Sequence, residues 1–499
     1  MKNDTVHGNI ILSLILVVFG TVFGLISLVN HYEFRTYALD LGMFNQALYS
    51  FAHLKLNYFT QAIDGSSVNY FADHFSLITV LYAPFYYLLR TYTLLVIQIL
   101  AILAGGVGIY AFARHEIKSA YLPLIVVLQF FGSWGIYSAL AFDFHNNVVA
   151  AMFVPWLAYC YVSGRKKLFV LFFILILIAK ENMALWLVFI MLGLMIQRGL
   201  THWRQLLRFE IPLLVSAAVY FLAVVGLIMP ALASEGGSAT LAHRYALFGN
   251  SPASIAEGIA LHPQQVVTSL FESAPPNSQH ADDKEGLHAM VIASGGLALL
   301  AAPSYIIMLI PVYLEKMLTV DPALWGITGQ YSIEFVPVIS LAFVALLVKL
   351  KRRKPGSRWL YAAAGVIAIM TYASLSYALI EGNLSTFKSD RNINLFSADH
   401  WKSDVDVHSV NSYLSRIPGD VPISVTSSLA PHLSFRDKVY IYPVVKDAQY
   451  LVLMQDSQDN FVVPGALPAG RNFRFMWQAL FLSPDRSHAY HFMIYIRSK

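Results

Sequence analysis

Residues 10–28 read IILSLILVVFGTVFGLISL, an apolar stretch without a single charged side chain. A helix needs ~20 apolar residues to cross ~30 Å of hydrocarbon, so this stretch is long enough to span a bilayer. Similar stretches recur at residues 94–113, 122–140, 213–228 and 360–380. No small-residue cleavage site follows the first one, which favours a membrane helix over a signal peptide. The sequence therefore predicts a polytopic membrane protein.

The overall composition agrees with this prediction. Of 499 residues, 57% are hydrophobic and 13% are charged, whereas charged residues make up about a quarter of a typical soluble protein. The net charge of +5 comes from short basic tracts between apolar stretches, so no nucleic-acid partner is expected. Cys160 is the one cysteine and cannot form an internal disulfide.

Basic tracts occur in every second loop, which the positive-inside rule places in the cytoplasm. They lie near Lys2 and at residues 114–118, 165–167, 198–208 and 349–358. This alternation predicts an α-helical membrane protein with about eleven transmembrane helices. It requires a re-entrant or interfacial helix at residues 77–89, which contain Pro84, and two short spans that meet at residues 180–182. The expected location is the cell inner (plasma) membrane, multi-pass, with the N-terminus in the cytoplasm.

Two regions are predicted. Residues 1–380 form the transmembrane domain, with long outer loops at 30–76 and 232–286. Residues 381–499 form a small extracytoplasmic α/β domain, because their hydrophobic runs shorten to strand length, as at 423–425, 439–441 and 450–453.

Asp40 is the first candidate for chemistry at the outer face. It precedes residues 44–51, whose apolar side chains predict an amphipathic helix along the membrane surface. A carboxylate held between apolar neighbours is expected to have a raised pKa, which suits a general base. The alternative interpretation is a helix N-cap or a solvated loop residue.

Two further motifs, Asp73-His74 and Asp143-Phe144-His145, combine a carboxylate with an imidazole. A divalent metal accepts both ligand types, although the spacing matches no specific zinc signature. Asp73, His74 and His145 are therefore candidate ligands of a divalent metal, the one cofactor that the sequence suggests. Helix capping by Asp73 and interfacial anchoring by His145 are the alternatives.

Lys180 and Glu181 interrupt an apolar stretch, where each charge costs roughly 2.5–3.5 kcal/mol on insertion scales. They are expected either to face a polar cavity or to form a simple salt bridge. In a cavity, Lys180 would bind a phosphate group as a point charge.

Four residues of later outer segments complete the candidate substrate-binding set: His243, Arg244, Tyr331 and Glu334. Arg244 is a candidate phosphate partner, and Tyr331 and Glu334 would line the same cleft. Loop and capping roles are the alternative for these residues. The sequence contains no P-loop and no G-x-G-x-x-G, H-E-x-x-H or G-x-S-x-G motif, so nothing favours nucleotide hydrolysis or the familiar soluble hydrolases.

These motifs resemble a family of bacterial predicted membrane proteins of unassigned function that is related to the GT-C glycosyltransferases. The matching segments are residues 40–48 (DLGMFNQAL), 73–76 (DHFS), 143–145 (DFH), 180–182 (KEN) and 330–332 (QYS). In the tail, Pro418 and residues 430–434 (APHLS), shortly before Arg436, are similar to the family's terminal domain.

The resemblance implies an inverting glycosyltransferase that takes a sugar from a polyprenyl-phosphate donor at the outer face of the membrane and transfers it to a glycan, lipid or protein. In GT-C enzymes an acidic residue of the first outer loop activates the acceptor or helps to bind metal, which corresponds to Asp40. A second acidic residue, in the next outer loop, corresponds to Asp143. Lys180 and Arg244 are the candidates that would stabilise the departing phosphate.

One departure limits the comparison, because the first loop lacks the paired acidic motif of the protein mannosyltransferases. Metal use and acceptor class therefore do not carry over. Two other function classes stay open. A transporter or lipid flippase would place Lys180 and Glu181 in its pathway near the membrane midplane. A membrane-anchored sensor or assembly factor would act through the tail domain.

Overall fold

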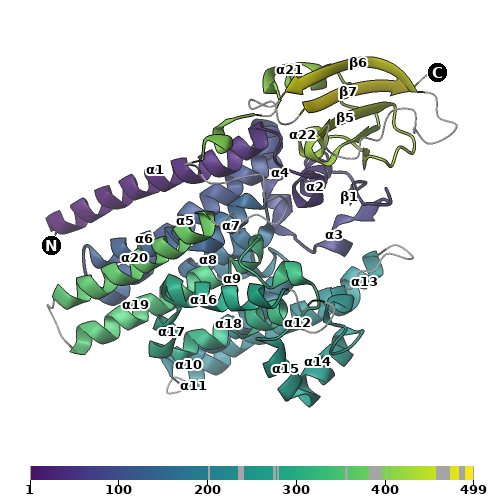
Figure 1. Cartoon of the computed structure of the whole chain (residues 1–499). Helices are drawn as coiled ribbons and strands as arrows, with labels where there is room; N and C mark the ends of the chain where they lie inside the picture. Colours follow the sequence, from purple (N-terminus) through teal and green to yellow (C-terminus); the bar gives the residue numbers. More distant parts are fainter. Residues whose placement is uncertain are drawn as a thin grey trace.

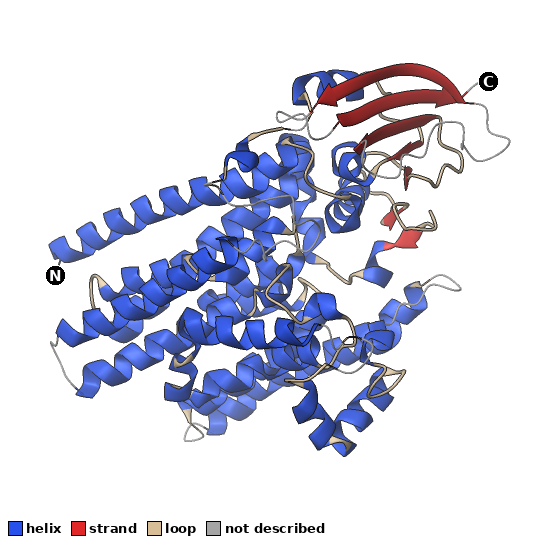
Figure 2. Cartoon of the chain, viewed as in Figure 1, coloured by secondary structure: helices blue, strands red, loops and turns tan. Residues whose placement is uncertain are grey.

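The computed structural model describes residues 2–199, 203–233, 241–273, 277, 280–353, 358–380, 395, 397–403, 405–456, 473–482 and 489–497. The described chain is mostly helical, with a small sheet formed by C-terminal residues (Figure 2). The N-terminus lies at the end of the helical bundle that is remote from this sheet (Figure 1).

Within the described ranges, seven stretches are long and apolar enough to cross a membrane. They are Val6–Tyr32, Ile78–Ile117, Leu122–Ala141, Glu181–Arg198, Trp203–Leu232, Gln330–Arg353 and Arg358–Ile380. Apolar side chains on the outer helices are widely exposed, as with Val17 at 67% and Ile369 at 69%. Such a surface suits lipid rather than water. The chain is therefore a multi-pass membrane protein, as predicted.

The helices of the bundle are α1 (Lys2–Tyr32), α4 (Ile78–Leu89), α5 (Thr93–Ile117), α6 (Leu122–Phe131), α7 (Trp134–Ala141), α8 (Asn146–Val162), α9 (Lys166–Leu177), α10 (Glu181–Arg198), α11 (Trp203–Gln205), α12 (Ile211–Ala223), α13 (Met229–Leu232), α16 (Ala281–Val291), α17 (Ala298–Ala301), α18 (Pro303–Met317), α19 (Phe335–Arg353) and α20 (Arg358–Ile380). Gly105 lets α5 approach α8 closely, because a Cβ there would lie 2.8 Å from the sulfur of Met152.

Two breaks in the helical bundle position the residues of interest. The 12-residue helix α4 is about 18 Å long, and it ends where Arg90 adopts a φ of 47°. A separate short helix was predicted there and is confirmed. The second break separates α9 from α10, so that Lys180 stands in extended conformation immediately before α10. The interruption predicted at residues 180–182 thus lies at residues 178–180, because α9 ends at Leu177 and Glu181 already opens the next helix.

The first outer loop folds into the π-helical turn η1 (Ala38–Gly42), α2 (Met43–Ala52), the two-stranded pair β1 (Tyr58–Phe59) and β2 (Val68–Asn69), and α3 (Tyr70–Asp73). Helix α2 packs on α4, and its polar residues Asn45 and Gln46 are fully buried. The prediction that residues 44–51 lie on the membrane surface is therefore wrong, because protein rather than lipid covers this helix.

The second long outer loop, predicted at residues 232–286, contains several short helices. These are the 3-10 helix η6 (Leu241–Tyr245), α14 (Pro252–Leu261) and α15 (Pro263–Ser269). Helix α16 already begins at Ala281, so the charged residues 282–285 belong to a helix rather than to the loop.

The C-terminal sheet has five strands in the order β4-β3-β5-β7-β6. Strands β4 (Val439–Ile441), β3 (Ile423–Val425) and β5 (Tyr450–Asp456) are parallel, while β7 (Ala489–Arg497) and β6 (Phe473–Leu482) are antiparallel. The short helices α21 (Val407–Leu414) and α22 (Ala430–Leu433) accompany them. All three predicted strands are confirmed. The predicted domain boundary at residues 380 and 381 adjoins residues 381–394, which lie outside the described residues.

The sheet is joined to the first outer loop by a shared core and by buried hydrogen bonds. Phe34 and Ala38 belong to the hydrophobic cluster of the C-terminal residues. The Gln46 amide donates to the carbonyl of Asp437 at 3.1 Å, and the Thr60 hydroxyl donates to the carbonyl of Val439 at 2.8 Å. The first outer loop is thus held between the helices and the sheet.

Candidate functional site

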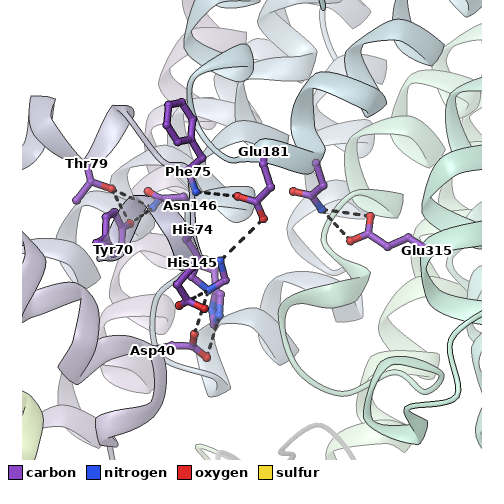
Figure 3. A network of polar contacts seen from close by, with 11 residues as sticks. Asp40, Tyr70, His74, Phe75, Thr79, His145, Asn146, Glu181 and Glu315 are labelled. Carbon is purple, nitrogen blue, oxygen red and sulfur yellow. Dashed lines mark hydrogen bonds and ion pairs between the residues drawn. The ribbon is translucent and has the colours of Figure 1, made fainter. Parts of the chain in front are cut away.

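Asp40 is the centre of a buried polar cluster at the sheet end of the helical bundle (Figure 3). Its side chain is 10% exposed, and its backbone has φ 65° and ψ −77°. These angles are close to those of the rare, strained form of γ-turn, in which φ is about +75° and ψ about −65°. Strained backbone of this kind concentrates at functional sites. The side chain caps no helix, since Gly42 is the N-cap residue of α2.

Two imidazole rings approach the Asp40 carboxylate from different elements. Nε2 of His145, which precedes α8, lies 3.1 Å from Oδ2. Nε2 of His74, which follows α3, lies 3.9 Å from Oδ1. His145 occupies the N-cap position of α8, but its side chain makes no capping hydrogen bond and contacts Asp40 instead.

Glu181 extends the cluster from the first outer loop to α10. Its Oε1 lies 3.9 Å from Nδ1 of His74, and its Oε2 accepts a hydrogen bond from the backbone N–H of Phe75 at 3.0 Å. Figure 3 shows these contacts leading from Asp40 through His74 to Glu181. One end of α10 is therefore tied to the strained turn that carries Asp40.

Lys180 supplies a positive charge beside this cluster. Its ammonium group has no hydrogen-bond or ion-pair partner in the described part of the chain, so the simple salt bridge with Glu181 is not formed. Burial alone would lower the pKa of Lys180, but the charges of Glu181, Tyr331, Glu315 and Asp40 outweigh it and raise the pKa. The half-buried ammonium is thus charged and available to an anion.

The pKa of Asp40 differs from the expectation. Burial tends to raise it, as predicted, but His145, His74 and Lys180 outweigh burial and lower it below the ordinary value. Burial lowers the pKa of His145 in spite of the Asp40 charge, whereas the acidic neighbours of His74 raise its pKa although burial opposes them. The predicted rise for Asp40 is therefore wrong, and its carboxylate is ionised at neutral pH.

Asp143 connects the loop before α8 with the segment before Asp40. Its φ is 71°, and its Oδ2 accepts a hydrogen bond from the backbone N–H of Tyr37 at 3.1 Å. Its carbonyl accepts from the Gln98 amide at 2.7 Å, while Gln98 Oε1 accepts from the backbone N–H of His145 at 2.9 Å. Asp143 thus helps to hold His145 and the segment before Asp40.

The remaining predicted residues are distributed around the cluster. Tyr331 interacts electrostatically with Lys180. Arg244 is engaged by Asp321 at 3.5 Å, and His243 is exposed on η6. Glu334 accepts a hydrogen bond from the Asn147 amide at 2.9 Å, in a buried group next to the site. The structure brings Tyr331 to the cluster, leaves Arg244 and Glu334 at its periphery, and does not bring His243 to it.

Glu315 of α18 was not predicted. It accepts hydrogen bonds from the Asn182 amide at 2.9 and 3.2 Å and interacts electrostatically with Lys180. Glu315 and Lys316 stand directly after the apolar residues 303–314. Lys180 and Glu181 follow an apolar stretch in the same way. The same signal would therefore have found Glu315.

The candidate metal ligands do not form a ligand set of their own, because His74 and His145 both face the Asp40 carboxylate. Asp73 lies 3.7 Å from Nε2 of His74, the same nitrogen that faces Asp40, and its side chain is 41% exposed. Among the described residues, no group of three or more His, Cys, Asp or Glu side chains is arranged to hold a metal ion. Capping of the helix at residues 77–89 by Asp73 is also wrong, since Leu77 is the N-cap residue of α4 and no side chain caps this helix. Asp73, His74 and His145 therefore do not fit a metal ion, and the proposed reaction uses none.

One protein family matches most of the chain. A family described as "Predicted membrane protein (DUF2079)" matches residues 30–468. The matched range contains the polar cluster, α2 to α20 and strands β1 to β5. No curated protein matches the chain.

Proposed function

The chain belongs to this family of predicted membrane proteins, and we propose that it is an inverting membrane glycosyltransferase that uses a polyprenyl-phosphate-linked sugar. One observation carries the proposal. A buried, ionised carboxylate, Asp40, is held by imidazole groups in the same cluster as the unpaired ammonium of Lys180. This combination provides a base and a cationic phosphate partner, the two groups that such a displacement needs.

In the proposed reaction, an acceptor hydroxyl attacks the anomeric carbon of the donor sugar from the face opposite the phosphate. The new C–O bond forms as the bond between the anomeric carbon and the phosphate oxygen breaks. Asp40 takes the hydroxyl proton, and the electron pair of the broken bond leaves with the polyprenyl phosphate. Lys180 stabilises the charge of this leaving group, while His145 and His74 orient Asp40.

The position of the cluster supports a lipid-linked donor. Glu181 is the first residue of the 18-residue helix α10, which is about 27 Å long. The cluster therefore lies at one face of the membrane rather than at its midplane. Helix α4 contacts the cluster region through Thr79, which accepts a hydrogen bond from Asn146, and exposes Leu81, Phe85 and Leu88 on its other side. An apolar helix face of this kind would border a groove for a polyprenyl chain.

We propose the finer topology on the same basis. The shorter helices α8, α9 and α18, together with the α16–α17 segment, would join the seven long stretches inside the bilayer. This gives the arrangement of about eleven spans that the basic loops predict, with α4 as the re-entrant helix. The cluster and the sheet would then face the outside of the inner membrane, and the N-terminus the cytoplasm.

Transport or lipid flipping is the second candidate. The observation in its favour is that Lys316 and Glu334 are almost fully buried among apolar helices, at 2% and 5% exposed. Ionisable residues inside a membrane protein commonly line ion or substrate pathways. Such a pathway would lead from Lys180 and Glu181 along α18 and α19.

A donor panel distinguishes the two candidates. The purified protein is incubated with radiolabelled polyprenyl-phosphate sugars and membrane extract as acceptor source, and is also reconstituted in liposomes with the same lipids. We expect label to leave the donor and appear in an acceptor. Movement of intact donor across the liposome bilayer, without cleavage, would contradict the transferase and support the flippase.

A further inference from the structure

A second polar site lies at the opposite end of the helices that carry the Asp40 cluster. It is a cavity of about 410 Å³ between the end of α8, the beginning of α9, the end of α10 and η4 (Leu206–Glu210). Its lining includes two cationic side chains, Lys166 and Arg198, the amides of Gln197 and Gln205, and the aromatic rings of Phe169 and Phe209.

The cavity and the Asp40 cluster lie at opposite ends of α8 and α10. Helix α8 begins at Asn146, next to His145, and ends at Val162, which lines the cavity. Helix α10 begins at Glu181 of the cluster and ends at Arg198 of the cavity. The 18 residues of α10 separate the two sites by about 27 Å, close to the thickness of the hydrocarbon core.

Hydrogen-bonding capacity in the cavity is only partly used. The Arg198 guanidinium donates to Glu210 at 3.2 Å and to Gln205 at 2.9 Å, which leaves further N–H groups of its five. Lys166 has no hydrogen-bond or ion-pair partner among the described residues, although its ammonium lies over the Phe209 ring. Both lining cations can therefore donate to an anionic ligand.

The surroundings of the cavity are strongly basic. Six cations occupy the two segments that border it: Arg165, Lys166, Lys167, Arg198, Arg204 and Arg208. One acidic residue, Glu116, lines the cavity itself, and its carboxylate contacts His115 at 3.0 Å. The neighbouring Glu210 is paired with Arg198, so basic residues still outnumber acidic ones here. An excess of positive charge at a bilayer surface attracts anionic headgroups.

Two exposed apolar side chains, which we call the rim, lie within two residues of lining residues in the sequence. Leu168 is 42% exposed and Leu207 is 55% exposed, and each adjoins a basic or lining residue in the sequence. A ligand that enters here would therefore keep an apolar part in the bilayer while its charged part reaches Lys166 and Arg198. A free anion would gain nothing from this rim.

We propose that this cavity binds the phosphate headgroup of an anionic phospholipid from the leaflet opposite the Asp40 cluster. The phosphodiester oxygens accept hydrogen bonds from Lys166 and Arg198, and the glycerol part packs against the aromatic rings. The site is independent of the glycosyltransferase proposal, since it shares no side chain with the Asp40 cluster.

Lys166 and Lys167 provide a matched test, because Lys166 lines the cavity and its neighbour Lys167 does not. The full-length protein and the variants Lys166→Gln and Lys167→Gln are prepared in neutral detergent. Binding of phosphatidylglycerol and of phosphatidylcholine is titrated by native mass spectrometry. Thermal unfolding without added lipid shows whether each variant is folded.

We expect the wild type and Lys167→Gln to bind phosphatidylglycerol with equal affinity and in preference to phosphatidylcholine. Lys166→Gln is expected to bind it about tenfold more weakly, because one charge-assisted hydrogen bond is lost. Equal weakening in both variants would overturn the proposal, since it would indicate unspecific attraction to a basic surface. Displacement of the lipid by millimolar inorganic phosphate would overturn the assignment to a lipid headgroup.

Discussion

Nε2 of His145 lies 3.1 Å from Oδ2 of Asp40, and this contact joins the turn after α1 to the beginning of α8. Asp40 is held in a strained backbone conformation, and His145 is positioned by Gln98 of α5. Three separate parts of the chain therefore determine where one carboxylate lies. The pairing also contributes to the lowered pKa of Asp40, which keeps it ionised in a buried place.

Replacement of His145 by Gln is expected to reduce the transferase rate by about 10- to 100-fold, because a hydrogen bond to a charged group is worth about 1.5–3 kcal/mol. Without this neighbour the pKa of Asp40 should rise, so the acid limb of the rate–pH profile should move to higher pH. The control is His53→Gln, since His53 is exposed at the end of α2 in the loop that carries Asp40. A reduced rate with an unchanged acid limb would show that His145 is only structural.

Lys180→Met should raise the KM for the donor about tenfold or more, because the phosphate loses a charge-assisted hydrogen bond. Lys180→Arg keeps the charge and should retain part of the affinity. The raised pKa of Lys180 means that the neighbouring carboxylates stabilise its charge in the folded state, so Tm should fall in Lys180→Met and fall less in Lys180→Arg. Donor titrations with each variant check this, and an unchanged KM in Lys180→Met would rule out a phosphate contact.

The raised pKa of His74 predicts a pH-dependent stability. Its protonated form is favoured in the folded state, so the stabilisation is complete below the unfolded pKa of about 6.5 and is lost as pH rises through the higher folded value. The Tm difference between the wild type and His74→Gln should therefore be largest at acidic pH and narrow above about pH 6.5. Thermal unfolding across this range provides the measurement. A Tm difference that does not change with pH would contradict the pairing of His74 with Asp73 and Glu181.

Gln46→Ala should lower the free energy of unfolding by about 1–3 kcal/mol, because the buried carbonyls of Arg436 and Asp437 lose a donor. Gln264→Ala, an exposed amide on α15, is the matched control. If both Gln variants unfold at the same temperature, the contact between the first outer loop and the sheet does not stabilise the folded protein.

The lengths of the main helices and strands could be predicted from the sequence. The long apolar stretches predicted the spans, and Pro84 together with the short run around it predicted α4 as a separate element. The helix α2 could not be placed correctly, because an apolar face looks the same whether lipid or protein covers it. The burial of Gln46 depends on the sheet, which lies almost four hundred residues later in the chain.

The members of the polar cluster were largely predicted, but their pairing was not. Asp40, Lys180 and Glu181 were identified from charge in an apolar setting, and His74 and His145 from motifs that pair an imidazole with a carboxylate. Which imidazole faces which oxygen depends on how α3, α8 and α10 pack, and the lowered pKa of Asp40 follows from that packing. Glu315 was missed although its sequence signal was equivalent. Asp143 was predicted to be catalytic, and this stays a prediction, since the hydrogen bond that its side chain accepts from the Tyr37 backbone does not test it.

The most direct test of the central claim is the release of polyprenyl phosphate from a lipid-linked sugar by the wild type, Asp40→Asn and Asp64→Asn. Asn tolerates the positive φ at position 40, so Asp40→Asn removes the base while keeping the turn. Asp64 lies exposed in the same outer loop and controls for the loss of one charge. We expect release by the wild type and Asp64→Asn, and a rate about 10²- to 10⁴-fold lower in a folded Asp40→Asn. Equal release by all three proteins would contradict the assignment of Asp40 as the base.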